Sequence, residues 1–127
     1  MALIAPPSGG EADAGAAQAA VAALESALAA SAATDAPVSL GAQFAPVSRL
    51  HRQNAPPALG AQAIAAALAS GPRQMTLNQI SSYASASGDM VFTLGTATWD
   101  GGKGIYGRIW THGEEGWRIV FDQIVLR

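Results

Sequence analysis

The chain of 127 residues contains no cysteine, so disulfide bonds are excluded. Charged residues are also scarce, at 13%, and seven basic residues stand against nine acidic ones, for a net charge of −2. This balance supplies no sequence-independent attraction to nucleic acid or to an anionic membrane, so we expect neither as a partner. A chain of this length should still bury roughly two-thirds of its unfolded surface, enough for one self-sufficient core.

Long hydrophobic runs are missing as well. The strongly apolar opening, residues 1–5, is far shorter than the roughly 20 residues that span a bilayer, so no membrane segment is predicted. We expect a cytoplasmic protein, or one exported to the periplasm if this opening is the remainder of a trimmed signal peptide. Residues 1–11, rich in proline and glycine, are predicted to be a flexible tail that precedes a single domain at 12–127.

Residues for metal binding and nucleophilic catalysis are few or wrongly spaced. The two histidines, His51 and His112, share no metal-ligand spacing with each other or with a carboxylate, so we expect no metal and no cofactor. No Gly-x-Ser-x-Gly elbow is present, which excludes the usual triad hydrolases. The Gly-Gly-Lys-Gly of residues 101–104 lacks the spacing and the Ser or Thr of a phosphate-binding loop, and a hairpin turn explains it.

What the chain does have is a sharp change of composition. Of its 29 alanines, 26 precede Ser70, whereas all three tryptophans and both tyrosines follow it. Alanine favours helices, while aromatic and β-branched residues favour strands. The order is therefore helices first and strands second, which predicts an α+β domain.

Residues 11–33 are predicted to form the first helix. Ala17, Val21, Leu24 and Leu28 recur at spacings of three and four, which places them on one helical face. Acidic residues at the start suit the helix dipole. So much alanine is also typical of a low-complexity spacer, but the leucines on one stripe favour the helix.

The middle of the chain is less regular. Residues 34–46 contain two prolines and a glycine and should be irregular, with at most one helical turn at 40–44. A short strand at 49–53 is ended by Asn54 and two prolines. A second helix fits residues 62–69, where a Gly-Pro pair follows.

Four strands are predicted in the second half, separated by three short turns. The turns are Ser-Gly-Asp at 87–89, Asp-Gly-Gly-Lys at 100–103 and His-Gly-Glu-Glu-Gly at 112–116. Connections this short require antiparallel neighbours. The strands are predicted at residues 74–85, 90–99, 104–111 and 117–126.

Four short motifs follow one another in a set order. They are Phe-Ala-Pro-Val-Ser-Arg-Leu-His at 44–51, Gly-Ala-Gln-Ala-Ile at 60–64, Tyr-Gly-Arg-Ile-Trp at 106–110 and Gly-Trp-Arg-Ile-Val-Phe-Asp at 116–122. Their order and spacing resemble the nuclear transport factor 2-like superfamily, in its SnoaL-like and ketosteroid-isomerase-like branch. The Arg-x-Trp followed by Gly-Trp is also similar to the association domain of calcium/calmodulin-dependent kinases, another member.

The resemblance covers about residues 12–127 and implies a definite fold. That fold is a cone, a strongly curved antiparallel sheet wrapped around the N-terminal helices, also known as cystatin-like. It implies an apolar pocket within the cone and a dimer through the outer face of the sheet. Many relatives carry an acidic residue after the first helices, where this chain has Val47 and Ser48, and this departure weakens a transfer of catalytic function.

The faces of the last hairpin depend on the length of its tip. With a three-residue tip at 113–115, even-numbered residues of both strands share one face, whereas a two- or four-residue tip would swap the second strand. We predict the three-residue tip, with Arg108 opposite Val120 and diagonal to Asp122. The resemblance to the association domain implies the same choice, because the arginine that corresponds to Arg108 in those relatives points into the cavity.

Arg108 is the central candidate of the site. An unpaired arginine in an apolar cone would cost several kcal/mol, so it requires a carboxylate or a bound anion, and Asp122 is in reach. The pair could serve structure alone, or Arg108 could also contact the acidic group of a ligand. The candidate ligand-binding residues are Arg108, Trp110, Trp99, Val120 and Ile124.

The opposite face of the hairpin is predicted to be apolar. An exposed area of this kind should be covered by a second copy of the chain, so we expect a homodimer. The alternative is that this is the inner face, in which case Arg108 and Asp122 would point to solvent. The residues concerned are Ile109, Trp117, Ile119 and Phe121.

Two classes of function remain. The first is a module that binds a small, mostly apolar and in some cases acidic molecule in the cone. The alternative is an isomerase, cyclase or dehydratase working by acid-base catalysis, with Asp122 as base, Tyr106 as hydrogen-bond donor and His51 as a second candidate base. Burial would raise the pKa of Asp122, but Arg108 would lower it, and this opposition favours binding over catalysis.

Overall fold

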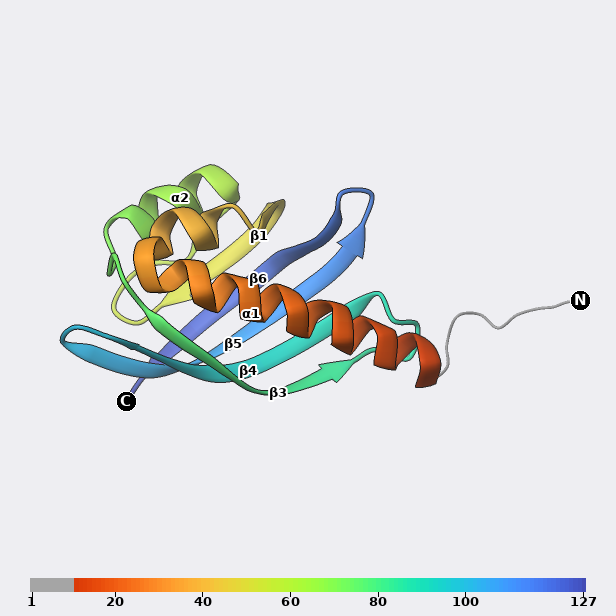
Figure 1. The fold of residues 1–127 in the computed structure, drawn as a ribbon. Coiled ribbons are helices and arrows are strands. Elements are labelled where there is room, and N and C mark those ends of the chain that lie inside the picture. The colour runs from red at the N-terminus through yellow and green to blue at the C-terminus, as the bar shows by residue number, and fades with distance from the viewer. Residues whose placement is uncertain (1–10) are drawn as a thin grey trace, which may run out of the picture.

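A computed structural model describes residues 11–127 of the chain, and the predicted tail lies outside the described residues except for Glu11, which is helical. Figure 1 shows a long helix lying across a curved sheet, with a short helix beside it. The elements are α1 Glu11–Gly41, β1 Phe44–Arg52, β2 Ala58–Leu59, α2 Ala61–Ala69, β3 Thr76–Ala84, β4 Met90–Trp99, β5 Gly102–Gly113 and β6 Gly116–Leu126. The predicted α+β class is confirmed.

Helix α1 extends further than predicted because its irregular part is only a kink. Asp35 has φ −148° and ψ 83°, outside the helical region, and Pro37 follows it. The Asp35 side chain then accepts a 3.4 Å hydrogen bond from the backbone N–H of Val38, as a helix N-cap does. The Pro-containing segment therefore restarts as a second helical stretch that reaches Gly41 instead of remaining irregular.

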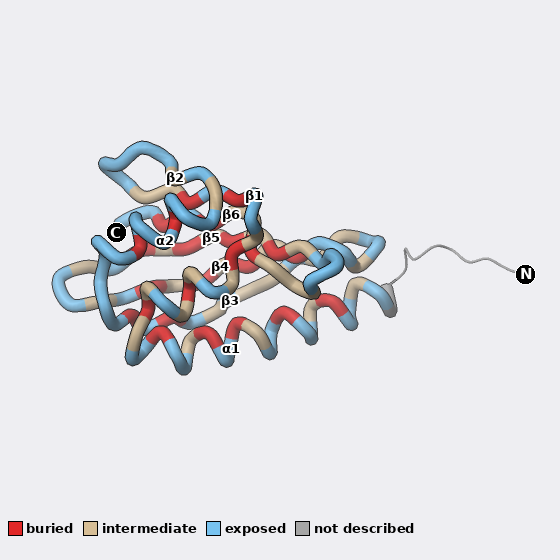
Figure 2. The backbone as a smooth tube through the Cα atoms, turned by 90° about the horizontal axis from the view of Figure 1, so that it is seen from above, coloured by how far each residue is buried: buried red, intermediate tan, exposed pale blue. Residues whose placement is uncertain are grey.

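The apolar stripe of α1 packs on the inner face of the sheet. Ala17, Val21 and Leu28 are buried as predicted, and Ala32 continues the stripe. Residues 13–41 have the length and composition of a bilayer span, as core helices also do. Here the buried stripe also carries Glu25, and Figure 2 shows a buried side and an exposed side on successive turns of the helix.

The sheet has the strand order β2-β1-β6-β5-β4-β3 and is mixed. Strands β3 to β6 pair antiparallel through short turns, as predicted, but β1 pairs with β6 in parallel. The predicted antiparallel sheet is thus found in β3 to β6, and the parallel pairing of β1 with β6 makes the whole sheet mixed. Hairpin turns determine only the direction of successive strands, and β1 is separated from β6 by several other elements.

The register of the last hairpin also corrects a prediction. Gly113 pairs with Gly116, so the tip has two residues, and Trp110 lies opposite Ile119. The register then shifts by one residue, so that Ile109 pairs with Phe121 and Arg108 lies directly opposite Asp122. A two-residue tip by itself would turn Asp122 to the outer face. The β-bulge at Val120 reverses this, so Asp122 points inward beside Arg108.

One glycine makes room for the inner layer of side chains. A Cβ on Gly95 of β4 would lie 2.5 Å from the Tyr106 ring and 2.5 Å from the backbone oxygen of Asn78. The Tyr106 ring therefore occupies the space that a side chain at position 95 would need. This close approach holds Tyr106 against the centre of the sheet.

Candidate functional site

Charged side chains lie in the centre of the domain, where α1 crosses β4, β5 and β6. Glu25 of α1 is 3% exposed, Arg108 of β5 1% and Asp122 of β6 0%. Buried charges are costly unless they are paired and hydrogen-bonded. The partners of these three residues therefore determine what the interior of the sheet can do.

Glu25 accepts hydrogen bonds from four side chains on two strands. Its Oε1 accepts from Arg108 Nη1 at 2.8 Å and from the Tyr106 hydroxyl at 3.1 Å. Its Oε2 accepts from Thr93 Oγ1 and from Trp110 Nε1, both at 2.8 Å. The Glu25 carboxylate thus accepts a hydrogen bond from each of these four donors of β4 and β5, as a bound anion would.

Asp122 joins two arginines. Its Oδ2 accepts from Arg108 Nε at 2.6 Å, and its Oδ1 accepts from Arg52 Nη1 at 2.7 Å. Arg52 comes from β1, which lies beside β6, and it also donates to its neighbour's carbonyl oxygen, that of His51, at 3.1 Å. The chain of contacts from Glu25 through Arg108 and Asp122 to Arg52 runs from the interior to the rim of the sheet.

The network contains two cations and two anions and so balances its own charge. Burial by itself would raise the pKa of Asp122, but the charges and hydrogen bonds of Arg108 and Arg52 lower it below the ordinary value. Burial would lower the pKa of Arg108, and the two carboxylates raise it instead. The charged forms of Asp122 and Arg108 are therefore favoured, and Asp122 is poorly suited to act as a base near neutrality.

Tyr106 serves this network as a donor. Burial, and then the nearby charge of Glu25, raise the pKa of its hydroxyl well above the ordinary range. The guanidinium carbon of Arg108 also lies 4.2 Å from the centre of the Tyr106 ring, at the distance of a cation–π contact. The phenol stays protonated and closes one side of the Arg108 site.

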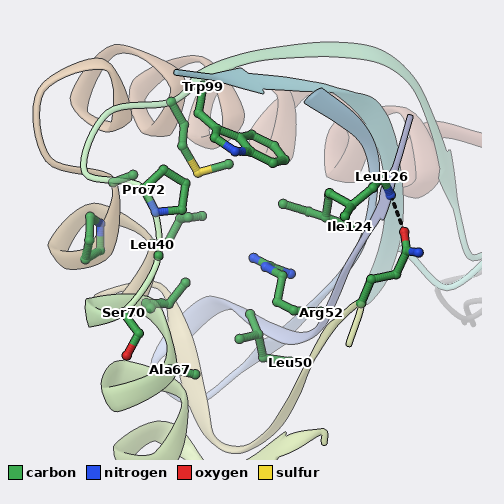
Figure 3. A pocket seen from close by; sticks show the side chains of 15 residues that line it. Leu40, Leu50, Arg52, Ala67, Ser70, Pro72, Trp99, Ile124 and Leu126 are labelled. Atoms are coloured by element: carbon green, nitrogen blue, oxygen red, sulfur yellow. Dashed lines mark hydrogen bonds between the residues drawn. The ribbon is translucent and has the colours of Figure 1, made fainter. Parts of the chain in front are cut away.

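A pocket of about 250 Å³ opens at one end of the sheet, away from Glu25. It lies between the last turns of α1, helix α2, and the ends of β1, β4 and β6 (Figure 3). Its walls are mostly apolar. They include Leu40, Leu50, Leu68, Met75, Trp99 and Ile124.

Arg52 connects the pocket to the buried network. Its side chain is 26% exposed, and Figure 3 shows the guanidinium in the middle of the pocket, between Leu50 and Trp99. It is the one charged residue among the pocket-lining residues that the structure describes. Beside it, the side chain of Gln53 accepts a hydrogen bond from the backbone N–H of Leu126, which joins β1 to the end of β6.

The residues predicted from sequence fall into three places. Asp122, Tyr106, Arg108 and Trp110 belong to the buried network, while Trp99 and Ile124 line the pocket. His51 and Val120 lie in neither place. The His51 ring instead stands 5.2 Å from that of Phe121, on the other face of the sheet.

Two residues of the site were missed. The sequence pattern places Glu25 in a helix without giving it a role, although it stands four residues after Val21 and three before Leu28, within the buried stripe. A carboxylate at such a position was a usable signal for a buried partner. Arg52 was placed on a short strand, and nothing local showed that it would reach Asp122, because that contact spans 70 residues.

Val47 and Ser48, where the resemblance would lead one to expect an acidic residue, contribute no carboxylate to the site. Val47 is 86% exposed, and Ser48 is buried and donates to the backbone oxygen of Ala45 at 2.7 Å. The carboxylate of the interior comes from α1 instead.

The outer face of the sheet differs from the prediction because the two-residue tip turns the start of β6 inward, up to the bulge at Val120. Ile119 is fully buried opposite Trp110, and Trp117 packs against the core from the same side. Ile109 and Phe121 do lie on the outer face, where Phe92 pairs with Ile109 and Tyr83 with Phe92. The apolar outer row is therefore Tyr83, Phe92, Ile109 and Phe121.

No protein-family model matches the sequence, and no curated protein matches it. Solved structures do match in fold. A domain of unknown function with a cystatin-like fold from Nostoc punctiforme has a TM-score of 0.69 at 13% identity, over 88% of this chain and 78% of the other. A protein of unknown function from Pectobacterium atrosepticum has a TM-score of 0.65 at 21% identity, over 92% of each chain.

Nuclear transport factor 2 from Cryptosporidium parvum is also similar. Its TM-score is 0.64 at 18% identity, over 96% of this chain and 100% of the other. These likenesses show that the chain has the nuclear transport factor 2-like, cystatin-like fold that its motifs predicted. Such a fold carries many unrelated functions, so the site itself must support any proposal.

Proposed function

We propose that this chain of nuclear transport factor 2-like fold binds a small, mostly apolar molecule in the pocket between α1, α2 and β1. The observation that carries the proposal is the pocket itself, about 250 Å³ with apolar walls and a guanidinium in its centre. Small-molecule sites combine apolar walls with a few polar groups in this way. A cavity of roughly 150 Å³ already admits benzene, so there is room for a ring with a short substituent.

The geometry offers little support for acid-base catalysis. Both oxygens of Asp122 are occupied by arginines that lower its pKa, and Tyr106 donates to Glu25 instead of facing the pocket. His51 lies on the opposite face of the sheet. A general base must reach the proton that it removes, and none of the three candidates lines the pocket.

Filling the mouth of the pocket is expected to abolish binding. Ala67 is an exposed residue of α2 that lines the pocket, so Ala67→Trp should place an indole in the opening. Ala65→Trp is the control, on the same helix but outside the pocket. With indole as probe, saturation-transfer NMR should show binding to the wild type and to Ala65→Trp, and little to Ala67→Trp. Equal signals from both variants would contradict this site.

We also propose that the outer row of Tyr83, Phe92, Ile109 and Phe121 pairs two copies of the chain. The Tyr83 and Phe92 rings stack with centroids 6.4 Å apart, and Tyr83 is largely exposed. A contiguous apolar row on an uncovered sheet face is typical of a subunit contact. A two-fold axis would bring the same row of a second copy against it.

A charge in this row is expected to dissociate the dimer. Ile109→Glu would bury a carboxylate in the contact, so we expect the dissociation constant to rise by about 100-fold or more. Val38→Glu is the control, because Val38 is an exposed apolar residue of α1. Sedimentation equilibrium measures both. A wild-type monomer at high micromolar concentration, or a dimer that Ile109→Glu leaves intact, would rule out this contact.

A further inference from the structure

Arg52 has hydrogen-bonding capacity that the protein does not use. A guanidinium carries five N–H groups, and the contacts of Arg52 to Asp122 and to the carbonyl oxygen of His51 both come from Nη1. Among residues 11–127, the hydrogen bonds of the Arg52 side chain all come from Nη1, and none comes from its Nε or Nη2. Three N–H groups are therefore left for something other than the described protein groups.

The free groups have the geometry of a fork. Nε and Nη2 form one edge of the planar guanidinium, and their N–H bonds run parallel, which suits the two oxygens of a carboxylate. The other edge is fixed by Asp122, which is itself held by Arg108 at 2.6 Å. Arg52 is thus held in place before any ligand arrives, which lowers the entropy lost on binding.

From this arrangement, and on the basis of the proposed pocket function, we infer that the ligand is a small monocarboxylate whose acid group binds the free edge of Arg52. Its apolar body would lie between Leu40, Met75 and Trp99. The charges of the buried network already sum to zero, so a bound carboxylate would add one uncompensated negative charge. That charge would lie at the partly exposed end of the network, where solvent and Arg52 stabilise it.

Arg52 and Arg108 differ in what their guanidinium groups can still bind. Arg108 has Glu25 on Nη1 and Asp122 on Nε and is almost fully buried, so its charge is already paired. An acidic ligand would meet the arginine at the rim of the sheet and not the one at its centre.

A pair of probes of the same shape tests this. 3-Phenylpropanoate and 3-phenylpropanamide differ chiefly in charge, and their dissociation constants at pH 7 can be compared by NMR titration. We expect the acid to bind the wild type about tenfold more tightly than the amide or better, as charge-assisted paired hydrogen bonds should provide. In Arg52→Gln the ratio should fall to about one.

The matched control is Arg49→Gln. Arg49 is on the same strand but exposed, so this variant removes the same charge and should keep the tenfold preference. In the wild type, the Nε–H resonance of Arg52 should shift with the acid and not with the amide, which tests the contact even if Arg52→Gln does not fold.

The outcomes distinguish the two proposals. Equal binding of acid and amide by the wild type, or an unchanged Arg52 resonance, would overturn the carboxylate preference while leaving the apolar pocket in place. Loss of preference in Arg49→Gln would show that general charge, and not the fork, attracts the acid. Failure of indole and both of these probes to bind would instead remove the pocket function on which the inference rests.

Discussion

Glu25→Ala is expected to lower the free energy of unfolding by about 3–5 kcal/mol, the usual effect of removing one partner of a buried ion pair. The variant leaves the Arg108 Nη1, the Trp110 Nε1, the Tyr106 hydroxyl and the Thr93 hydroxyl without their shared acceptor. Each buried donor that loses its partner adds a desolvation cost. Urea unfolding followed by tryptophan fluorescence measures the change.

Two further variants test whether the loss of stability comes from the buried charge of Glu25. Glu25→Gln keeps an acceptor oxygen but loses the charge, so it should fall between the wild type and Glu25→Ala. Glu114→Ala removes a carboxylate from the exposed tip of the last hairpin and should leave stability unchanged. If Glu25→Ala were as stable as Glu114→Ala, the network would not be a main stabilising feature of the fold.

Asp122→Asn is expected to destabilise by about 3 kcal/mol at neutral pH, because Arg52 and Arg108 both lose a charged acceptor. The effect should depend on pH in a definite direction. The folded state holds the pKa of Asp122 below its ordinary value, so between the two pKa values the unfolded chain binds more protons. The stabilisation is therefore complete above the unfolded pKa, about 3.9, and is lost as the pH falls through the folded value.

The measurement is the difference in unfolding free energy between wild type and Asp122→Asn across pH. That difference should be constant from about pH 5 to 8 and should shrink below about pH 4. Asp100→Asn, in the exposed turn between β4 and β5, should show no such difference. A wild-type advantage that grew on acidification would contradict the assigned direction.

Because the charges of the buried network are paired with one another, the candidate binding site lies at the end of the sheet and not at its centre. In the interior, Glu25 already occupies the position that a bound anion would take beside Arg108 and Trp110. The free space and the free donors are at the rim, around Arg52. Binding there can therefore be tested without disturbing Glu25.

Much of the second half could be predicted because its signals are local. The strand at Met90–Trp99 has the bounds expected from alternation and its flanking turns, and the same pattern places Arg108 on one face with Tyr106 and Trp110. The inward direction of that face was chosen from the assumed tip and the family resemblance. The prediction of that direction was right, although its assumed tip was wrong. A three-residue tip, and a two-residue tip followed by a bulge, bring Asp122 to the same side.

The misses arise from contacts between distant segments. The parallel pairing of β1 with β6 and the reach of Arg52 to Asp122 depend on where the chain returns after several elements. The two-residue tip also changed the outer row, because Trp117 and Ile119 turned inward, and the bulge at Val120 kept Phe121 on the outer face. No single-sequence pattern marks a one-residue insertion in a strand.

The amino-acid order by itself determined the helix-then-strand arrangement, the hairpins and the grouping of Tyr106, Arg108 and Trp110 on one face, because periodicity and turn composition act over a few residues. Only the tertiary structure decided that Glu25 would neutralise Arg108 and that Arg52 would stand in the pocket. A buried charge is stable only where partners from separate segments meet it, and that meeting depends on the packing of the whole sheet against α1.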